Sequence, residues 1–81
     1  DESERIIFRS SQKVRHVNRL IHANIPYEDD ETLLEVMMKK MKADEVEAGV
    51  GACIYFQKFG LRIAKITDGK ITRIEVIRSI Q

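Results

Sequence analysis

An Asp-Gly pair between two apolar, β-branched runs is the feature that most constrains how this chain folds. Asp68 and Gly69 separate residues 61–66 from residues 71–77, and both runs are rich in isoleucine. In this setting an Asp-Gly pair is a strong signal for a two-residue hairpin turn, because both turn positions take positive φ. We therefore expect two antiparallel strands joined tightly at this point.

A two-residue turn fixes the register of this hairpin. Arg62 then lies opposite Glu75, an attractive cross-strand pair, and Ala64 lies opposite Arg73. The other face carries four apolar side chains: Leu61, Ile63, Ile74 and Val76. A shift of the strand register by one residue would expose all four.

A capping box marks the start of the most clearly predicted helix. Thr32 and Glu35 have the spacing at which each side chain accepts a hydrogen bond from the other residue's backbone N–H. We expect the helix to run to about residue 47 or 48 and to end at Gly49. Its apolar stripe at helical spacing is expected to enter the core: Leu34, Met37, Met38 and Met41.

Two further segments have the composition of strands. Residues 5–9 are a short β-branched and aromatic run, and residues 52–57 form a third strand joined to the hairpin. Side chains alternate between the two faces of a strand, so in residues 52–57 Ile54 and Phe56 point to one side and Tyr55 to the other.

Residues 11–24 allow two interpretations. As a helix, capped by Ser10 or Ser11 and stopped at Asn24, the segment aligns an apolar stripe consisting of Val14, Val17, Leu20 and Ile21. As a strand, it aligns a face that Arg19 interrupts, consisting of Val17, Ile21, Ala23 and Ile25. We prefer the helix.

The preferred element order is β-α-α-β-β-β, which predicts an α+β, two-layer domain with an antiparallel sheet packed on one or two helices. A strand at residues 11–24 gives β-β-α-β-β-β instead, which resembles a β-grasp domain of the ubiquitin-like or Ras-binding type. That resemblance implies an interaction domain in which Arg15 and Arg19 receive an acidic partner by edge pairing.

The chain has 81 residues, 43% of them hydrophobic and 33% charged, which suits one small domain. We expect a polar tail at residues 1–4 and a single domain at residues 5–81, and the sequence is compatible with a domain of a longer protein. A lone cysteine, Cys53, and the lack of an apolar run near the roughly 20 residues of a membrane span favour a cytoplasmic or nuclear location. The net charge of +1 gives no global attraction to nucleic acid, so basic residues must act by local clustering.

The sequence lacks a complete catalytic or metal-binding set. Cys53 lies inside a predicted strand, with no helix N-terminus before it to activate the thiol. The spacing of His16 and His22 fits neither a helical metal pair nor a zinc finger. We expect no catalytic residue, no metal site and no cofactor.

Clusters of basic residues are the remaining candidates for function. Arg62 and Arg73 share the polar face of the hairpin with Tyr55 beside them, and guanidinium groups with an aromatic ring on an open sheet face bind phosphates and stack on unpaired bases. A second basic group lies near the N-terminus and consists of Arg5, Arg9, Lys13, Arg15 and Arg19. We therefore expect a non-enzymatic interaction module that binds an acidic protein partner or RNA and no membrane. A second copy is a further candidate partner, at a sheet edge or on the face formed by Met37, Met38 and Met41.

The C-terminal strands resemble those of RelE/ParE-type bacterial toxins, through residues 60–63, 68–71 and 74–78. The resemblance implies ribosome-dependent cleavage of messenger RNA or inhibition of gyrase, with an antitoxin as partner. Arg62, which follows the family's glycine, and Arg78, which ends its last strand, would then be functional residues.

Overall fold

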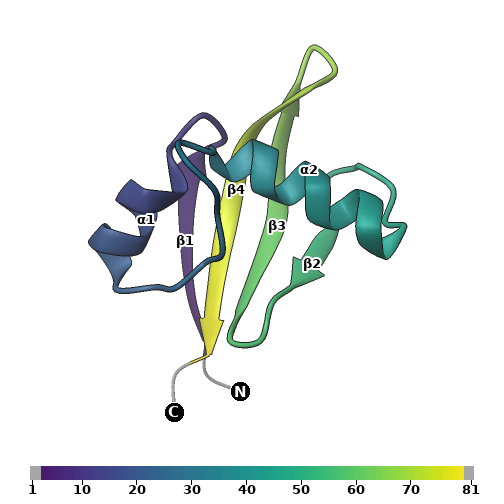
Figure 1. The fold of residues 1–81 in the computed structure, drawn as a ribbon. Coiled ribbons are helices and arrows are strands. Elements are labelled where there is room, and N and C mark those ends of the chain that lie inside the picture. The colour runs from purple at the N-terminus through teal and green to yellow at the C-terminus, as the bar shows by residue number, and fades with distance from the viewer. Residues whose placement is uncertain (1–2, 80–81) are drawn as a thin grey trace.

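Both helices lie against the same side of a four-stranded antiparallel sheet (Figure 1). The computed structural model describes residues 3–79. The sheet order is β1-β4-β3-β2, so the first and last strands of the chain lie side by side. The elements, in chain order, are β1 (Ser3–Arg9), α1 (Val14–Ile21), α2 (Leu33–Asp44), β2 (Cys53–Tyr55), β3 (Phe59–Thr67) and β4 (Lys70–Ser79).

This order confirms the predicted α+β, two-layer fold with β-α-α-β-β-β connectivity. The β-grasp alternative was wrong, because α1 occupies the segment where that fold needs a second strand. Within residues 3–79, neither helix has the length and apolar character needed to cross a bilayer.

The β3–β4 hairpin turns at Asp68 and Gly69, as predicted. Both residues take positive φ, 52° and 77°, the conformation of a two-residue turn that matches the twist of its strands. Arg62 pairs with Glu75 as predicted. The predicted apolar pairs also form, Leu61 with Val76 and Ile63 with Ile74.

The predicted pairing of Ala64 with Arg73 was wrong. The register shifts between Ile63 and Lys65 and shifts back before Ile66, so that Lys65 lies opposite Arg73. Such a bulge sets two residues of one strand against one residue of its partner and increases the local twist. Turn chemistry fixes the register at the turn itself but does not reveal an irregularity farther along the strands.

The covered face of the sheet forms the core together with the helices. Leu61, Ile63, Ile74 and Val76 are each no more than 1% exposed. Buried helix residues pack on the same core: Val14, Val17, Ile21, Leu33, Val36, Met37 and Met41.

The predicted helix stripes were partly wrong. Leu20 and Met38 are exposed, and Leu34 is only partly buried. In α2, Leu33 and Val36 join Met37 and Met41 in a stripe at i, i+3, i+4 and i+8, which faces the sheet along one side of the helix.

Backbone hydrogen bonds tie the two helix starts together. The N–H of Val14 donates to the carbonyl of Glu31 at 3.0 Å, and the N–H of Leu33 donates to the carbonyl of Gln12 at 2.9 Å. Each bond satisfies one of the free N–H groups of a first helical turn, so the chain segment before each helix helps to cap the other.

The capping box of Thr32 and Glu35 is confirmed, with both reciprocal bonds present. The predicted cap of α1 by Ser10 or Ser11 was wrong. Lys13 occupies the N-cap position and makes no side-chain cap bond, because the bonds between the two helix starts supply acceptors there instead.

The first helix ends before the predicted stop at Asn24. His22 takes a left-handed conformation with φ of 55°. The side-chain amide of Asn18 then donates to the carbonyl of Ile25 at 3.1 Å and accepts from the N–H of Ile25 at 2.9 Å. Asn18 thereby fixes the chain as it leaves the helix.

The second helix also ends earlier than residue 47 or 48, so the predicted stop at Gly49 was wrong. Glu45 takes a left-handed conformation with φ of 56°, and the N–H of Val46 donates to the carbonyl of Met41 at 2.9 Å. Val46 packs partly against the core, and such an apolar contact commonly accompanies this kind of helix end.

The strand bounds differ slightly from those predicted. β1 begins at Ser3, so residues 3 and 4 of the predicted tail belong to the sheet. β2 is limited to Cys53–Tyr55, because the N–H of Phe56 bonds the carbonyl of Phe59 at 2.7 Å in the connection to β3. Residues 1–2 and 80–81 of the predicted tail and domain lie outside the described residues.

The covered face is tested by comparing two isoleucines on opposite sides of the sheet. Ile74→Ala removes a fully buried side chain and should lower the free energy of unfolding by about 2–5 kcal/mol, measured by urea denaturation. Ile7→Ala is the matched control, since Ile7 is 57% exposed, and it should cost less than about 1 kcal/mol. Equal losses would contradict the assignment of the two faces.

Candidate interaction surface on the open face of the sheet

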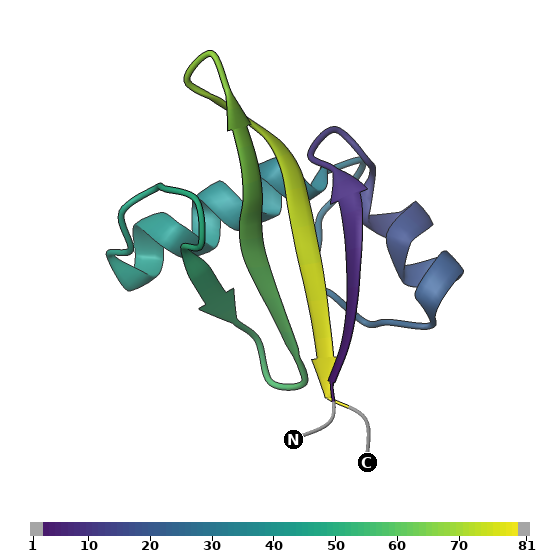
Figure 2. The same ribbon diagram turned by 180° about the vertical axis from the view of Figure 1, so that it is seen from behind.

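One face of the sheet is left uncovered by the helices, and we call it the open face (Figure 2). The odd-numbered residues of β1 and residues 73, 75 and 77 of β4 point to it, because Ile74 and Val76 face the core. The strand register adds the residues of β3 and β2 that lie opposite them. The open face includes Arg5, Ile7, Arg9, Cys53, Tyr55, Gly60, Arg62, Lys65, Arg73, Glu75 and Ile77.

At the centre of the open face, Glu75 holds two arginines. Its side chain is 11% exposed, and its Oε1 accepts hydrogen bonds from Arg5 at 3.5 Å and from Arg62 at 3.3 Å. Arg5 belongs to β1 and Arg62 to β3, so these contacts cross β4 and join three strands. One carboxylate shared by two guanidinium groups leaves this cluster with a net positive charge.

Next to this cluster, three basic residues form a row across the sheet. The register aligns Arg9 of β1, Arg73 of β4 and Lys65 of β3. Within residues 3–79, no ion pair includes any of the three. Like charges directly opposite each other destabilise a sheet, so this row costs stability and receives no compensation from the described part of the chain.

Tyr55 is the exposed aromatic residue of the open face, with 68% of its surface accessible. It lies opposite Gly60, and a Cβ added there would come within 3.2 Å of two carbons of the Tyr55 ring. The ring therefore covers the glycine. A hydrogen bond with the neighbouring Cys53 side chain raises the pKa of Tyr55 above its ordinary value, and the exposed side chain offers a flat ring with an O–H group.

The structure brings together three of the six predicted binding residues: Arg62, Arg73 and Tyr55 all lie on the open face. The other three lie elsewhere. Arg15, on α1, pairs with Asp30, and Arg19 is exposed in the last turn of α1.

Arg78 lies on the helix side of the sheet rather than on the open face. Its guanidinium group bonds the carboxylate of Glu4 and the carbonyl of Ile21. These contacts connect β4 to β1 and to the end of α1, so the structure gives Arg78 bonds that hold the fold together.

Sequence reasoning missed Arg5 and Arg9 as members of the same surface as Arg62. They belong to the N-terminal basic group in the sequence, and the pairing of β1 with β4 carries them across to the C-terminal one. The alternation of Arg5, Ile7 and Arg9 in a strand was a signal that they share one face, but their neighbours could not be read from it.

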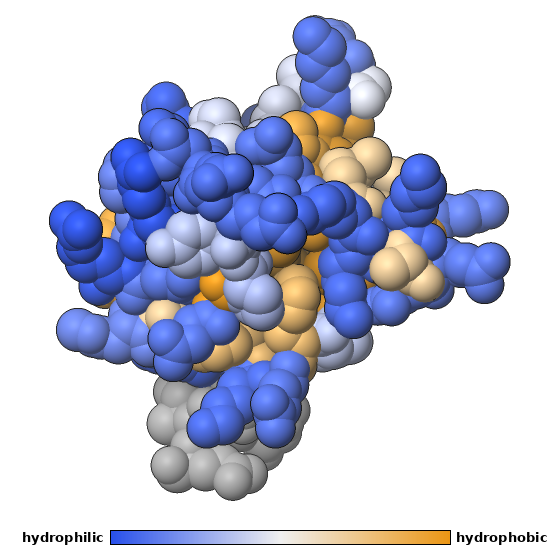
Figure 3. All heavy atoms as spheres, viewed as in Figure 1, coloured by the Kyte–Doolittle hydropathy of each residue, from blue (hydrophilic) through white to orange (hydrophobic). Residues whose placement is uncertain are grey.

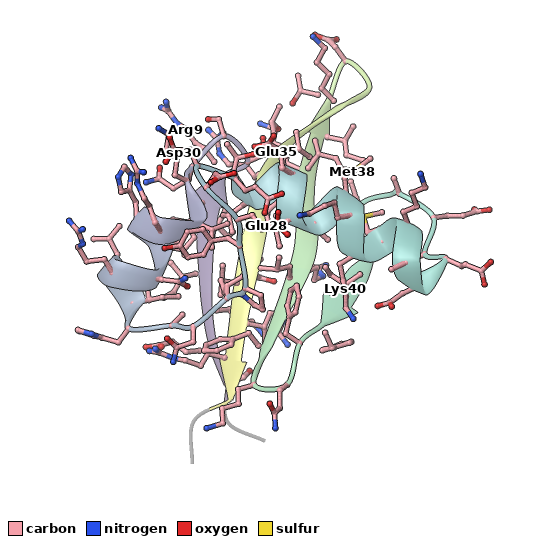
Figure 4. The ribbon with its side chains drawn as sticks, viewed as in Figure 1. Arg9, Glu28, Asp30, Glu35, Met38 and Lys40 are labelled. Atoms are coloured by element: carbon pink, nitrogen blue, oxygen red, sulfur yellow. The ribbon has the colours of Figure 1, made fainter. Side chains whose placement is uncertain are left out.

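The helix side of the molecule carries a separate, largely apolar groove. It has a volume of about 430 Å³ and is lined by Pro26, Tyr27, Glu28, Glu31, Val36, Lys39, Lys40, Ala43 and Phe56. Figure 3 shows apolar surface exposed below the polar side chains of α2. Figure 4 shows Glu28 on the loop before α2 and Lys40 on α2 itself.

The charged residues that line this groove are balanced, with two carboxylates, Glu28 and Glu31, and two lysines, Lys39 and Lys40. The Lys39 Nζ lies 2.6 Å from a carboxylate oxygen of Glu31, and this hydrogen bond lowers the pKa of Glu31. Lys40 Nζ lies 5.6 Å from the centre of the Phe56 ring. The groove thus offers apolar surface but no excess of one charge that would select a partner.

The methionine face predicted for a second copy is mostly buried. Met37 and Met41 belong to the core, and Met38 is 47% exposed. Met38 and Met41 line a second hollow of about 460 Å³ on α2.

Within residues 3–79, no group of three His, Cys, Asp or Glu side chains could hold a metal ion.

Comparison with known proteins identifies similar folds. No protein-family model and no curated protein sequence matches the chain. The fold is similar to a conserved protein of unknown function from Haemophilus influenzae Rd KW20, with a TM-score of 0.73, 15% identity, and coverage of 96% of this chain and 99% of that one. It is also similar to a CorC_HlyC domain from Haemophilus ducreyi, with a TM-score of 0.70, 15% identity, and coverage of 96% and 100%.

These similarities overturn the resemblance to RelE/ParE-type toxins. The matches extend over almost the whole chain, and one of them is to a CorC_HlyC domain, whereas the resemblance rested on the C-terminal strands alone. A tight Asp-Gly hairpin is common to many antiparallel sheets, so those strands carried little information about the family.

The shared carboxylate of Glu75 should make its contact with Arg62 measurable. In a double-mutant cycle with Arg62→Gln and Glu75→Gln, we expect a coupling free energy of about 1 kcal/mol, from urea denaturation of the four proteins. The i,i+4 pair of Lys40 and Asp44, with its atoms 3.4 Å apart, is the control and should give about 0.3 kcal/mol. A coupling near zero between Arg62 and Glu75 would show that the central cluster does not form.

Proposed function

We propose that this chain is an interaction module whose open face binds an acidic segment of another protein. The observation that carries the proposal is the row of Arg9, Arg73 and Lys65, which have no carboxylate partner within residues 3–79. A feature that opposes folding without compensation is typical of a functional site. A bound carboxylate would relieve the repulsion within the row.

The rest of the open face favours a peptide over a nucleic acid. Ile7, which is 57% exposed, lies between Arg5 and Arg9, and Ile77 lies opposite Arg5. Apolar side chains between the arginines match the side chains of a peptide better than a continuous phosphate backbone. Tyr55 is the large aromatic exposed on this face, whereas binding of single-stranded nucleic acid usually stacks successive bases on several rings.

Glu75 supports the same interpretation. It accepts hydrogen bonds from Arg5 and Arg62, which restrict where two of the guanidinium groups lie before a partner binds. Groups that are positioned in advance lose less conformational entropy on binding. Their remaining N–H groups can donate to a carboxylate of the partner.

Neutralising Arg9 tests whether the basic row is kept for binding. Arg9→Gln preserves the aliphatic stem and removes one of the opposed charges, so it should raise the free energy of unfolding by about 0.2–0.5 kcal/mol in urea denaturation. The same change should weaken binding of poly-glutamate about threefold at low salt, measured by NMR titration of the labelled domain.

Arg19→Gln is the matched control, because Arg19 is an exposed arginine on α1. It should leave the binding of poly-glutamate unchanged. A destabilised Arg9→Gln variant with unchanged binding would contradict the proposal. Tighter binding of a uridine oligonucleotide than of poly-glutamate would assign the face to nucleic acid instead.

A further inference from the structure

β1 is a long edge strand of the sheet. It pairs with β4 on one side and has no strand on the other within the described chain (Figure 2). The opposite edge of the sheet, β2, has only 3 residues, whereas β1 has 7. Exposed edges of this length are the sites at which extended peptides add to a sheet.

Hydrogen bonding to β4 determines which groups of β1 face outward. The N–H of Ser10 donates to the carbonyl of Thr72 at 3.0 Å, in the register of the β1–β4 pair. Bonded residues alternate along an antiparallel strand, so the even-numbered residues of β1 bond β4 and the odd-numbered ones face the outer edge. Arg5 and Ile7 therefore direct both N–H and C=O away from the sheet.

These outward groups are unpaired in the described chain. Within residues 3–79, no hydrogen bond reaches the backbone N–H or C=O of Arg5 or Ile7 from outside the strand pairing. The carbonyl of Arg9 accepts a bond from the N–H of Gln12 at 3.0 Å, which ends the free edge at that residue.

The residues with outward backbone groups also carry their side chains on the open face. Along the edge these side chains are a cation at Arg5, an apolar group at Ile7 and a cation at Arg9. We propose that β1 binds an extended acidic segment of a partner protein as an additional edge strand. Its carboxylates face Arg5 and Arg9, and an apolar side chain between them faces Ile7.

This inference rests on the proposed function and adds the binding mode and the pattern of the partner. Cross-strand neighbours interact most strongly when they are directly opposite. The partner strand therefore has two acidic residues four positions apart and an apolar residue midway between them. All three side chains lie on the same face of the strand. The acidic group nearest Arg9 also neutralises the row that continues to Arg73 and Lys65.

Charge argues against a second copy of this chain as the occupant. If two copies of β1 paired antiparallel over their full length, about Ile6, Arg5 would lie opposite Ile7 of the second copy. It would also lie diagonal to that copy's Arg5 and Arg9, close enough for long side chains to interact. The guanidinium groups of both copies would gather on one face, so the arginines disfavour self-pairing and favour an acidic strand.

Amide hydrogen exchange of the whole chain tests the inference directly. The probe is a short peptide with glutamate, valine and glutamate at every second position and small polar residues between them. In an extended strand these three side chains share one face. Binding should slow exchange of the Arg5 and Ile7 amides at least about tenfold, because they become hydrogen-bonded. The amides of Ile6 and Phe8 are the internal control, since they already bond β4 and should not change.

Two modified peptides separate edge pairing from simple charge attraction. N-methylation of the amides on the bonding edge of the peptide should weaken binding at least about tenfold, because the ladder bonds are lost while the charges remain. A peptide of the same composition with its glutamates adjacent should bind at least about threefold more weakly, because its carboxylates no longer share one face.

The outcomes distinguish this inference from the proposed function. Binding of the peptide without protection of Arg5 and Ile7, or without sensitivity to N-methylation, would overturn edge pairing and leave the open face as an acidic-partner site. If neither poly-glutamate nor the peptide with glutamate, valine and glutamate on one face binds at low salt, the proposed function itself is overturned. Protection of these amides in the free protein that increases with its concentration would identify a second copy as the occupant and overturn the inference.

Discussion

The pairing of β1 with β4 is the interaction on which the rest of the structure depends. It joins the two ends of the chain and adds a strand to a hairpin that the sequence already encodes locally. It also orients the segment after β1, whose backbone bonds the start of α2 and so connects the two helices. This strand pairing joins the residues most distant in sequence, and the entropic cost of closing a loop grows with its length.

The same pairing makes the two faces of the sheet chemically different. Alternation sends Ile74 and Val76 into the core beneath the helices and sends Arg73 and Glu75 outward. β1 then contributes Arg5 and Arg9 to the outward side. Glu75 compensates Arg5 and Arg62, while Arg9, Arg73 and Lys65 remain uncompensated within the described residues. The open face is thus partly organised by its own carboxylate and partly short of one, which is the physical basis for expecting an acidic partner.

Local chemistry made much of this fold predictable from the sequence. The turn at Asp68 and Gly69 gave the hairpin register near the turn and across Arg62, and the capping box of Thr32 located the start of α2. What could not be predicted depends on contacts distant in sequence. The bulge at Lys65, the exposure of Met38 and the proximity of β1 to β4 follow from tertiary packing, and no pattern within a short window encodes them. The candidate site was therefore half predicted: Arg62, Arg73 and Tyr55 were identified, but Arg5 and Arg9 were assigned to a separate group.

The most direct test of this account is the register between β1 and β4. In the non-hydrogen-bonded pairs of an antiparallel sheet the α-carbons lie only about 4.5 Å apart, so their α-protons give strong nuclear Overhauser effects. The structure predicts such effects between Ile7 and Glu75 and between Arg9 and Arg73. Effects that instead join Ile7 to Ile74 or to Val76 would place the arginines of β1 on the helix side and contradict the account.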